Sequence, residues 1–141
     1  MQEKDQSRCL LMFRGTICAG ATVLATTAHA LPPLESVDAV RNGLITAAIA
    51  YEISEVCPGI DVRLLRGIAY LEGLKGEARR LGYSRDEIDD FIEDKAAKAR
   101  LEASARAQLE AKGAVRGDAN SHCQVGQAEI SANSQIGRLL R

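Results

Sequence analysis

Cys123 and the histidine before it, His122, are the residues of this sequence whose types best suit nucleophilic chemistry. A Cys–His nucleophile requires converging side chains, so that the imidazole can take the thiol proton. Neighbouring residues on a helix point about 100° apart, which predicts that these two side chains diverge. Structural zinc requires four ligands, and only Cys57, Cys123 and His122 have the preferred types after residue 30. We therefore predict no catalytic residue and no metal ligand, and we expect His122→Ala to leave the protein's role largely intact.

A second chemical feature is an acidic run from Asp86 to Asp94, which holds six carboxylates in nine residues. Within it, Asp89-Asp90-x-x-Glu93 imitates the metal-binding aspartate motif of prenyl-transfer enzymes, but those enzymes need a second motif and a far larger helical barrel. Two interpretations remain open. The acids either stabilise the positive N-terminal end of a helix, or they form a weak divalent-cation or partner surface. The helix interpretation is favoured, because basic residues follow in the same segment: Lys95, Lys98, Arg100, Arg106 and Lys112.

Several function classes are disfavoured by absent motifs and by charge. The sequence contains no Cys-x-x-Cys pair, no haem-attachment motif, no Gly-rich phosphate loop and no Gly-x-Ser-x-Gly elbow. Its 141 residues balance 18 basic against 19 acidic side chains. Nucleic-acid binders need a basic excess that neutralises phosphates, so no nucleic-acid partner is expected. The sequence predicts a protein that is not an enzyme and that carries no cofactor.

The first 30 residues resemble a signal peptide for export. A run of small and apolar residues, 15–30, ends with Ala28 and Ala30 at the −3 and −1 positions of a cleavage site. Signal peptidase accepts small residues at these positions, which predicts cleavage before Leu31. The run has 16 residues, whereas a spanning helix needs about 20. We therefore expect a periplasmic mature protein that does not span the membrane.

The start of this segment leaves alternatives open. Arg8 and Arg14 supply positive charge before the apolar run, but acidic residues also occur near Met1. Translation from Met12 would give a more compact signal, so either methionine is a candidate start. The competing interpretation of the whole segment is an ordinary N-terminal helix or an uncleaved anchor.

Residues 31–141 are then a single domain with two cysteines, Cys57 and Cys123. In an oxidising compartment, an even pair of cysteines in a small domain most often forms a disulfide. The alternative is two free, buried thiols. A bond would constrain the unfolded chain and stabilise the domain by about 4 kcal/mol.

Apolar residues recur at three- and four-residue steps, whereas no segment alternates with the period of a strand. This pattern predicts an all-α fold, a small bundle of about four helices in which one disulfide ties the first helix to the last. The expected helices run from Glu35 or Ser36 to Cys57, from about Asp61 to Leu81, from Ser84 to Lys112 with a candidate break at 94–97, and from Asn120 or Ser121 to about Asn133.

The same spacing predicts which faces are buried. In the first helix the apolar face contains Val37, Val40, Leu44, Ala48 and Tyr51, widened by Ile45, Ile49 and Ile53. In the second helix it contains Leu64, Ile68, Leu71, Leu74, Ala78 and Leu81. In the third helix the face continues from Ile88, Phe91 and Ile92 into an alanine stripe at Ala96, Ala99, Ala103 and Ala107.

Three glycines interrupt the second helix, at positions 67, 73 and 76. Each costs about 1 kcal/mol relative to alanine in a helix. We interpret them as sites where neighbouring helices pack closely; the alternative is that they admit a partner's backbone or a ligand.

The sequence resembles a small bacterial family of unknown function. The resemblance spans nearly all of the mature chain and is carried by Cys57-Pro58-Gly59-Ile60, the stretch Arg63 to Leu71, Leu81-Gly82-Tyr83-Ser84, and Cys123, Gly126, Glu129, Ser134 and Ile136-Gly137. It implies a short exported protein. It also implies a respiratory association, because the family's genes often lie in clusters for the proton-pumping NADH:quinone oxidoreductase (complex I), and some members are labelled as a subunit of it.

These observations favour a non-enzymatic periplasmic helical protein that binds, or helps to assemble, a protein partner in the membrane, with complex I as the partner that the resemblance implies. An alternative is a small disulfide-bonded acid-stress chaperone of the periplasm, in which protonation of carboxylates exposes apolar surface. A third hypothesis, a weak enzyme or metal carrier, has the least support from the residues.

Overall fold

The computed structural model describes residues 30–141, in which the chain is helical and no strand longer than a single bridge forms. This part contains a short 3-10 helix, η1, and six α-helices rather than about four. The difference arises because the long third segment divides at Asp94 and the tail forms a helix of its own after Asn133. The elements are η1 (Leu34–Ser36), α1 (Asp38–Val56), α2 (Leu64–Arg80), α3 (Arg85–Glu93), α4 (Lys95–Ala111), α5 (Ala119–Ser131) and α6 (Gln135–Leu139).

Residues 1–29 of the predicted signal sequence, including Ala28, lie outside the described residues. Of the predicted cleavage site, Ala30 and Leu31 are described, and both are exposed. Within residues 30–141, no helix combines the length and the apolar character that a membrane crossing requires.

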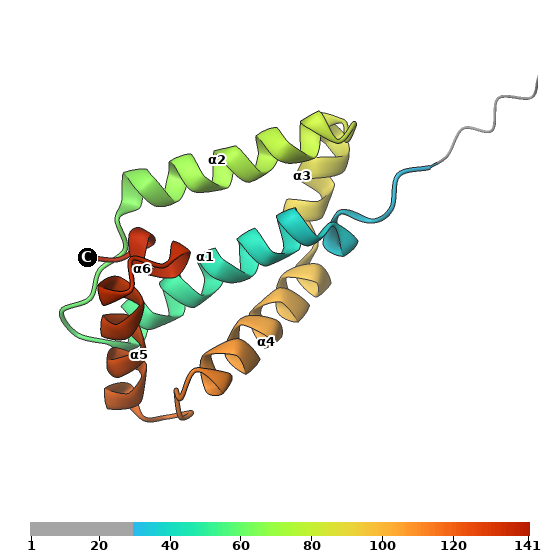
Figure 1. Ribbon diagram of the computed structural model, residues 1–141. Helices are drawn as coiled ribbons and strands as arrows, with labels where there is room; N and C mark the ends of the chain where they lie inside the picture. The colour runs from blue at the N-terminus through green and yellow to red at the C-terminus, as the bar shows by residue number, and fades with distance from the viewer. Residues whose placement is uncertain (1–29) are drawn as a thin grey trace, which may run out of the picture.

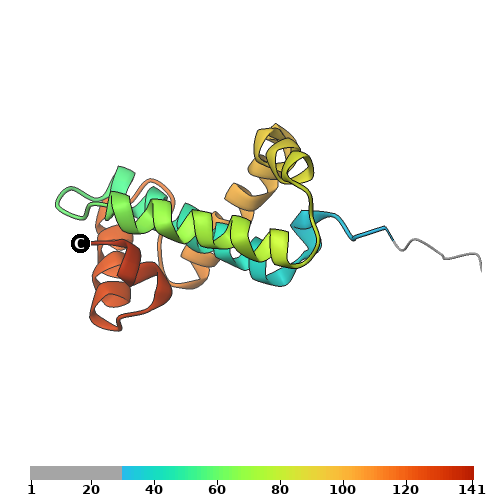
Figure 2. The ribbon, with the colours of Figure 1, turned by 90° about the horizontal axis from the view of Figure 1, so that it is seen from above.

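Helix α1 is the centre of the molecule. It lies between α2 and α4 and also contacts η1, α5 and α6 (Figure 1). At one end, α3 connects α2 to α4, and at the other end α5 and α6 pack against the second half of α1, an arrangement that both views show (Figures 1 and 2). We call these the α3 end and the disulfide end.

The disulfide end holds the larger hydrophobic core. Ile49 and Ile53 of α1 are fully buried there, together with Leu109 of α4 and Leu140 after α6. Burial of a side chain of this size contributes about 1.5–3 kcal/mol. Because this core joins four helices, it defines the position of α5 and α6 on α1.

Two glycines permit the close packing of this end. A Cβ atom on Gly126 would lie 2.8 Å from side-chain carbons of Ile53 and Ile60. A Cβ atom on Gly137 would overlap the backbone oxygen of Glu129. Glycine therefore lets α5 approach α1, and α6 approach α5, more closely than any other residue would.

The carboxyl-terminal residues complete this end by pairing with the segment before α2. Val62 and Leu140 form an isolated antiparallel bridge. The backbone N–H of Arg63 donates to the oxygen of Leu139 at 2.7 Å, and its Nε donates to the oxygen of Leu140 at 2.7 Å. The start of α2 is thus attached to the tail.

The α3 end has a smaller core, formed by Leu34, Val40, Ala78, Tyr83 and Ile88. Ala78 is the only buried residue of the 17 in α2. The Tyr83 hydroxyl donates to the oxygen of Pro32 at 2.5 Å, which holds the chain before η1 against the turn between α2 and α3. Fewer buried side chains therefore hold this end together.

Local signals in the sequence define most helix boundaries. Ser84 and Glu87, three residues apart at the start of α3, form a capping box: the backbone N–H of Glu87 donates to Ser84 Oγ at 3.2 Å, and Ser84 N–H donates to Glu87 Oε2 at 2.8 Å. Gly82 adopts a φ of 103°, as expected for the residue that follows a helix. Two helices start elsewhere than expected. Helix α2 begins at Leu64 with Arg63 as its N-cap residue, rather than at about Asp61, and α5 begins at Ala119 with Asp118 as its N-cap residue, rather than at Asn120 or Ser121.

The predicted face of the first helix is partly wrong. Ile45, Ile49 and Ile53 form the core, but Tyr51 is 59% exposed. A central helix is surrounded by neighbours, so both parts of its face are used: Val40 of the first stripe is buried at the α3 end, and the widened part of the face occupies the core of the disulfide end.

The predicted glycine packing in α2 is also wrong. A Cβ atom on Gly67 or Gly73 would meet nothing within 4 Å, and one on Gly76 would meet only the end of the Arg79 side chain. These glycines do not lie at a helix contact.

Candidate functional site

Cys57 and Cys123 are bonded to each other, with their Cα atoms 5.2 Å apart, which confirms the predicted disulfide. Cys57 follows the end of α1, and Cys123 lies in the second turn of α5. The bond therefore joins the first long helix to the penultimate helix, across a sequence separation of 66. Because each sulfur is bonded, neither is available as a thiolate nucleophile.

His122 is 6% exposed and takes part in the start of α5. Its Nδ1 lies 2.9 Å from the backbone oxygen of Asp118, so this nitrogen carries the proton and donates it. The imidazole therefore serves to close the first turn of the helix. Within residues 30–141, no three side chains of the His, Cys, Asp and Glu types gather where they could hold a metal ion.

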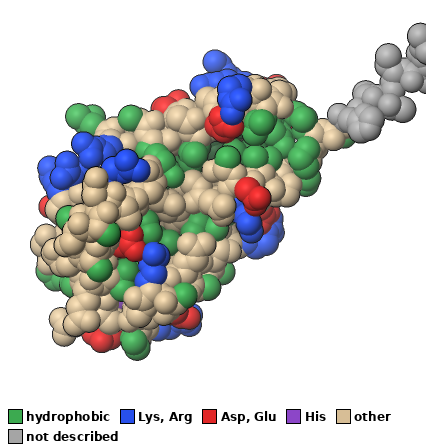
Figure 3. All heavy atoms as spheres, viewed as in Figure 1, with side chains coloured by type: hydrophobic (Ala, Val, Ile, Leu, Met, Phe, Trp, Pro, Cys, Tyr) green, Lys and Arg blue, Asp and Glu red, His purple; other side chains and the backbone are tan. Residues whose placement is uncertain are grey.

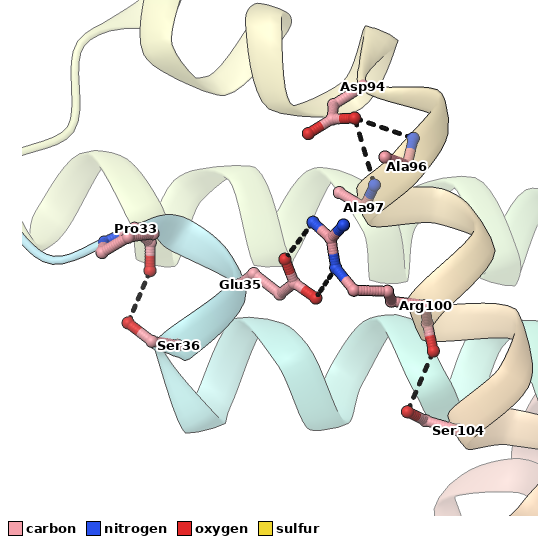
Figure 4. A network of polar contacts seen from close by, with 8 residues as sticks. All are labelled: Pro33, Glu35, Ser36, Asp94, Ala96, Ala97, Arg100 and Ser104. Atoms are coloured by element: carbon pink, nitrogen blue, oxygen red, sulfur yellow. Dashed lines mark hydrogen bonds and ion pairs between the residues drawn. The ribbon is translucent and has the colours of Figure 1, made fainter.

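The acidic run divides into residues with structural roles and residues without them. Asp94 Oδ1 accepts the backbone N–H groups of Ala97 and Ala96, at 3.1 and 2.8 Å, as the N-cap of α4 (Figure 4). These hydrogen bonds lower the pKa of the Asp94 carboxyl. The backbone N–H and the hydroxyl of Ser84 likewise lower the pKa of Glu87.

Asp86, Asp89 and Glu93 have no such role. They follow one another at steps of three and four residues, so they share one exposed face of α3. None of them forms an ion pair with another residue in the described part of the chain. Because α3 ends at Glu93, this residue lies in the last turn, where the helix dipole disfavours negative charge, and Asp89 lies at the midpoint of the helix, beyond the first turn that the dipole stabilises. The dipole interpretation of the sequence therefore does not explain these two.

The principal cavity of the α3 end is an apolar groove of about 380 Å³ between α2, α3, η1 and the start of α1. Ten of the twelve lining residues are apolar, and the other two are Glu72 and Lys75. In Figure 3, hydrophobic side chains gather over this end of the molecule. We call this cavity the α2–α3 groove; it is lined by Leu34, Val40, Leu44, Ile68, Leu71, Glu72, Leu74, Lys75, Ala78, Ile88, Phe91 and Ile92.

The two sides of the groove expose large apolar side chains. Ile68 on α2 is 50% exposed, and Ile92 on α3 is 52% exposed. Asp89 precedes Ile92 by one turn, so the α3 side of the groove combines an apolar edge with a row of carboxylates. Helix α3 as a whole carries five carboxylates and one arginine.

The third wall of the groove depends on an ion pair. Glu35 of η1 accepts two hydrogen bonds from Arg100 of α4, at 2.7 and 2.6 Å (Figure 4). This contact lowers the pKa of the Glu35 carboxyl. Leu34, the neighbour of Glu35, is 6% exposed and lines the groove. The ion pair thus holds η1, and with it one wall of the groove, against α4.

A second hollow of about 620 Å³ lies between α1 and α4 and shares Leu44 and Leu71 with the groove. Five of its eleven lining residues are charged, and Tyr51 is its exposed aromatic residue. Its charged lining suits an apolar ligand less than the α2–α3 groove does.

The groove could not be predicted from the sequence, because the spacing of Leu64, Ile68, Leu71 and the rest of their stripe indicates a buried helix face. The three glycines beside that stripe were a signal in the sequence. In the structure α2 packs mainly against α1 and has smaller contacts with α3 and α6, so part of its stripe has no neighbour to cover it. A stripe that exceeds the area of the neighbouring helices must remain exposed.

The geometry defines a helical domain with one disulfide and an apolar groove. The chain belongs to a family of unknown function, DUF5333, which matches residues 32–141. No curated protein and no solved structure matches the chain.

Proposed function

We propose that the chain is an exported, non-enzymatic protein that binds a helical segment of a membrane-protein partner in its α2–α3 groove. The groove is the observation that carries the proposal, because apolar side chains such as Ile68 and Ile92 remain half exposed on both of its sides. Exposed apolar patches bounded by polar residues are typical of interaction sites.

The charges around the groove define the kind of helix that fits. Asp86, Asp89 and Glu93 form a row beside Ile92, and none of them is ion-paired in the described chain. An amphipathic helix whose apolar face is bordered by lysine or arginine would bury its apolar residues and pair its cations with this row. We therefore propose a basic amphipathic segment as the occupant.

The proposed compartment is the periplasm. A disulfide is compatible with an oxidising space, and the residues before Leu31 resemble a cleavable signal. The gene association implied by the resemblance makes the membrane arm of complex I the proposed partner, which an exported protein would meet at its periplasmic face. N-terminal sequencing of the protein from the periplasm should begin at Leu31; an intact 15–30 segment would contradict the proposed cleavage.

Capture from solubilised membranes tests the binding proposal. We expect the wild-type protein to retain subunits of complex I and Ile92→Asp to lose them. The matched control is Val115→Asp, because Val115 is 58% exposed and lies in the loop between α4 and α5, away from the groove. Equal capture by wild type and Ile92→Asp would overturn the proposal.

One observation favours the acid-chaperone alternative. Protonation of Glu35 would release η1 from Arg100 and expose Leu34 together with the groove. A chaperone of this kind should prevent aggregation of a client protein at acid pH but not at neutral pH. In that case Glu35→Gln, which resembles the protonated state, should protect the client at neutral pH as well.

A further inference from the structure

The most exposed large apolar side chains of the described chain lie outside the groove, at the start of α2. Leu64 is 67% exposed and Leu65 is 83% exposed. They are adjacent in the first turn of a helix that contains no acidic residue in that turn. Neither residue lines the groove or the second hollow.

Arginines surround these two leucines. Arg63 and Arg66 flank them in sequence, and both are exposed. Arg63 Nε donates to the oxygen of Leu140, and Arg66 Nη1 donates to the oxygen of Arg138 at 3.2 Å. Because the tail is attached in this way, Arg138 and Arg141 lie at the same end of the molecule, where blue side chains gather in Figure 3.

Acidic charge at this end is sparse. Among the residues described, Asp61 is the only acidic ion-pair partner of these four arginines, and its Oδ2 lies 3.9 Å from Arg141 Nε. Both of these side chains are largely exposed, at 73% and 66%. The positive end of the α2 dipole adds to the same potential. We call this surface the Arg–Leu patch, formed by Arg63, Leu64, Leu65, Arg66, Arg138 and Arg141.

We propose that the Arg–Leu patch binds the surface of a bilayer that contains anionic lipids. Protruding leucines insert into the interfacial region of a bilayer, while arginines at the same depth contact phosphate oxygens and keep their charge in water. A second copy of the chain fits less well, because a twofold contact through this patch would place the arginines of both copies against each other.

The proposal is independent of the groove, since the two surfaces share no residue. It would orient the molecule with the start of α2 toward the lipid. Along α2 the groove begins at Ile68, one turn after Leu64, and extends to Ala78. A membrane that covers only the first turn of α2 would therefore leave most of the groove accessible to a partner.

Vesicle flotation with the full chain tests the proposal. Vesicles of phosphatidylcholine alone are compared with vesicles that also contain phosphatidylglycerol. The double variant Leu65→Ser with Arg66→Gln removes one leucine and one arginine of the patch. We expect it to weaken binding to the anionic vesicles by about fiftyfold, from about tenfold for the leucine and about fivefold for the arginine.

The chain offers a matched control in Val115 and Arg116, an adjacent apolar and arginine pair that is also exposed, at 58% for Val115. Val115→Ser with Arg116→Gln makes a corresponding change elsewhere, an exposed apolar residue to serine and an exposed arginine to glutamine, and should leave vesicle binding unchanged. Because both double variants retain the rest of the chain, any contribution of other segments is the same in both.

Three outcomes would overturn the proposal. The patch variant could bind anionic vesicles as well as the wild type does, or the wild type could bind neutral and anionic vesicles equally. The patch variant could also lose capture of the membrane-protein partner while it still binds vesicles. The last outcome would assign the patch to a protein partner. The groove variant Ile92→Asp should float with anionic vesicles like the wild type, so failure of the groove proposal and failure of the lipid proposal are separable.

Discussion

The disulfide end and the α3 end of this bundle are stabilised by different means. At the disulfide end, a covalent bond, an isolated backbone bridge and a core around Ile49 and Ile53 hold α5 and α6 against α1. At the α3 end, a five-residue cluster and an exposed ion pair between Glu35 and Arg100 hold η1, α3 and the second half of α2. The apolar groove lies at the end with the weaker internal contacts.

This difference indicates a division of roles within one small domain. Segments with few buried contacts open locally at a lower free energy than a core does. Binding surfaces also require apolar side chains that the fold itself leaves exposed, such as Ile68 and Ile92. We infer that the disulfide end supplies the stability that allows the α3 end to keep an exposed groove.

Removal of the disulfide is the strongest way to test this comparison. Cys57→Ala with Cys123→Ala should lower the free energy of unfolding by about 4 kcal/mol, because the unfolded chain loses a constraint across 66 residues. Urea denaturation measures this loss, and hydrogen exchange should show α5 and α6 losing protection first. Reduction of the wild-type protein is the control and should give a similar loss. A change below about 1 kcal/mol would show that packing alone holds this end.

The substitution Gly137→Ala adds one methyl group and tests the packing of the disulfide end without changing the disulfide. Gly137→Ala should destabilise the protein by about 3 kcal/mol, because the new Cβ would overlap the backbone oxygen of Glu129 and backbone yields less readily than a side chain. Thermal unfolding by circular dichroism measures the effect. A variant as stable as the wild type would show that α6 moves away from α5 at little cost.

The features that could be predicted from the sequence are those encoded by neighbouring residues. The Ser84–Glu87 capping box, Gly82 after α2, the end of α1 at Cys57-Pro58 and the cysteine pair all follow from local chemistry. Each depends on residues within one turn, or, for the disulfide, on the presence of only two cysteines after residue 30.

Features that depend on the orientation of distant elements could not be predicted. The alanine stripe predicted at Ala96, Ala99, Ala103 and Ala107 is exposed, whereas the buried residues of α4 are Ala97, Ala105 and Leu109. The reason is the break at Asp94, whose ψ of 101° ends the helical path, so that the periodicity of α3 does not continue into α4. The position of the α3 carboxylates beside the groove likewise depends on how α3 is oriented against α2, which the spacing of residues within α3 does not show.

Gly73→Ala is a smaller test, at the α3 end, and it should change the stability in the opposite direction to Gly137→Ala. Gly73→Ala should stabilise the protein by about 1 kcal/mol, because alanine favours the helix and its Cβ would meet nothing within 4 Å. The same substitution at Gly137 destabilises, so the two variants form a matched pair. Urea denaturation of both provides the measurement. A destabilised Gly73→Ala variant would indicate a close neighbour on that face of α2.

The pH dependence of the Glu35–Arg100 ion pair gives the smallest and most local test. The hydrogen bonds from Arg100 lower the pKa of Glu35 below its ordinary value of 4.5. Because folding favours the carboxylate form of Glu35, the ion pair stabilises the protein above about pH 4.5. This stabilisation is lost as the pH falls through the lowered pKa of Glu35. Glu129 at the disulfide end also has a lowered pKa, because the ion pair with Lys112 and the hydrogen bond from Ser134 outweigh the effect of burial.

Two variants separate these carboxylates. Glu35→Gln should increase hydrogen exchange in η1 and at the start of α4 at pH 7, and it should remove the part of the acid response that is specific to those segments. Glu129→Gln should instead affect α5 and α6, because Glu129 lies on α5 and contacts Ser134 before α6. Exchange of each segment is measured by mass spectrometry between pH 7 and pH 3, with correction for the intrinsic rate. If both variants loosened the same segments, the two ends would unfold as one unit and the proposed division of roles would be wrong.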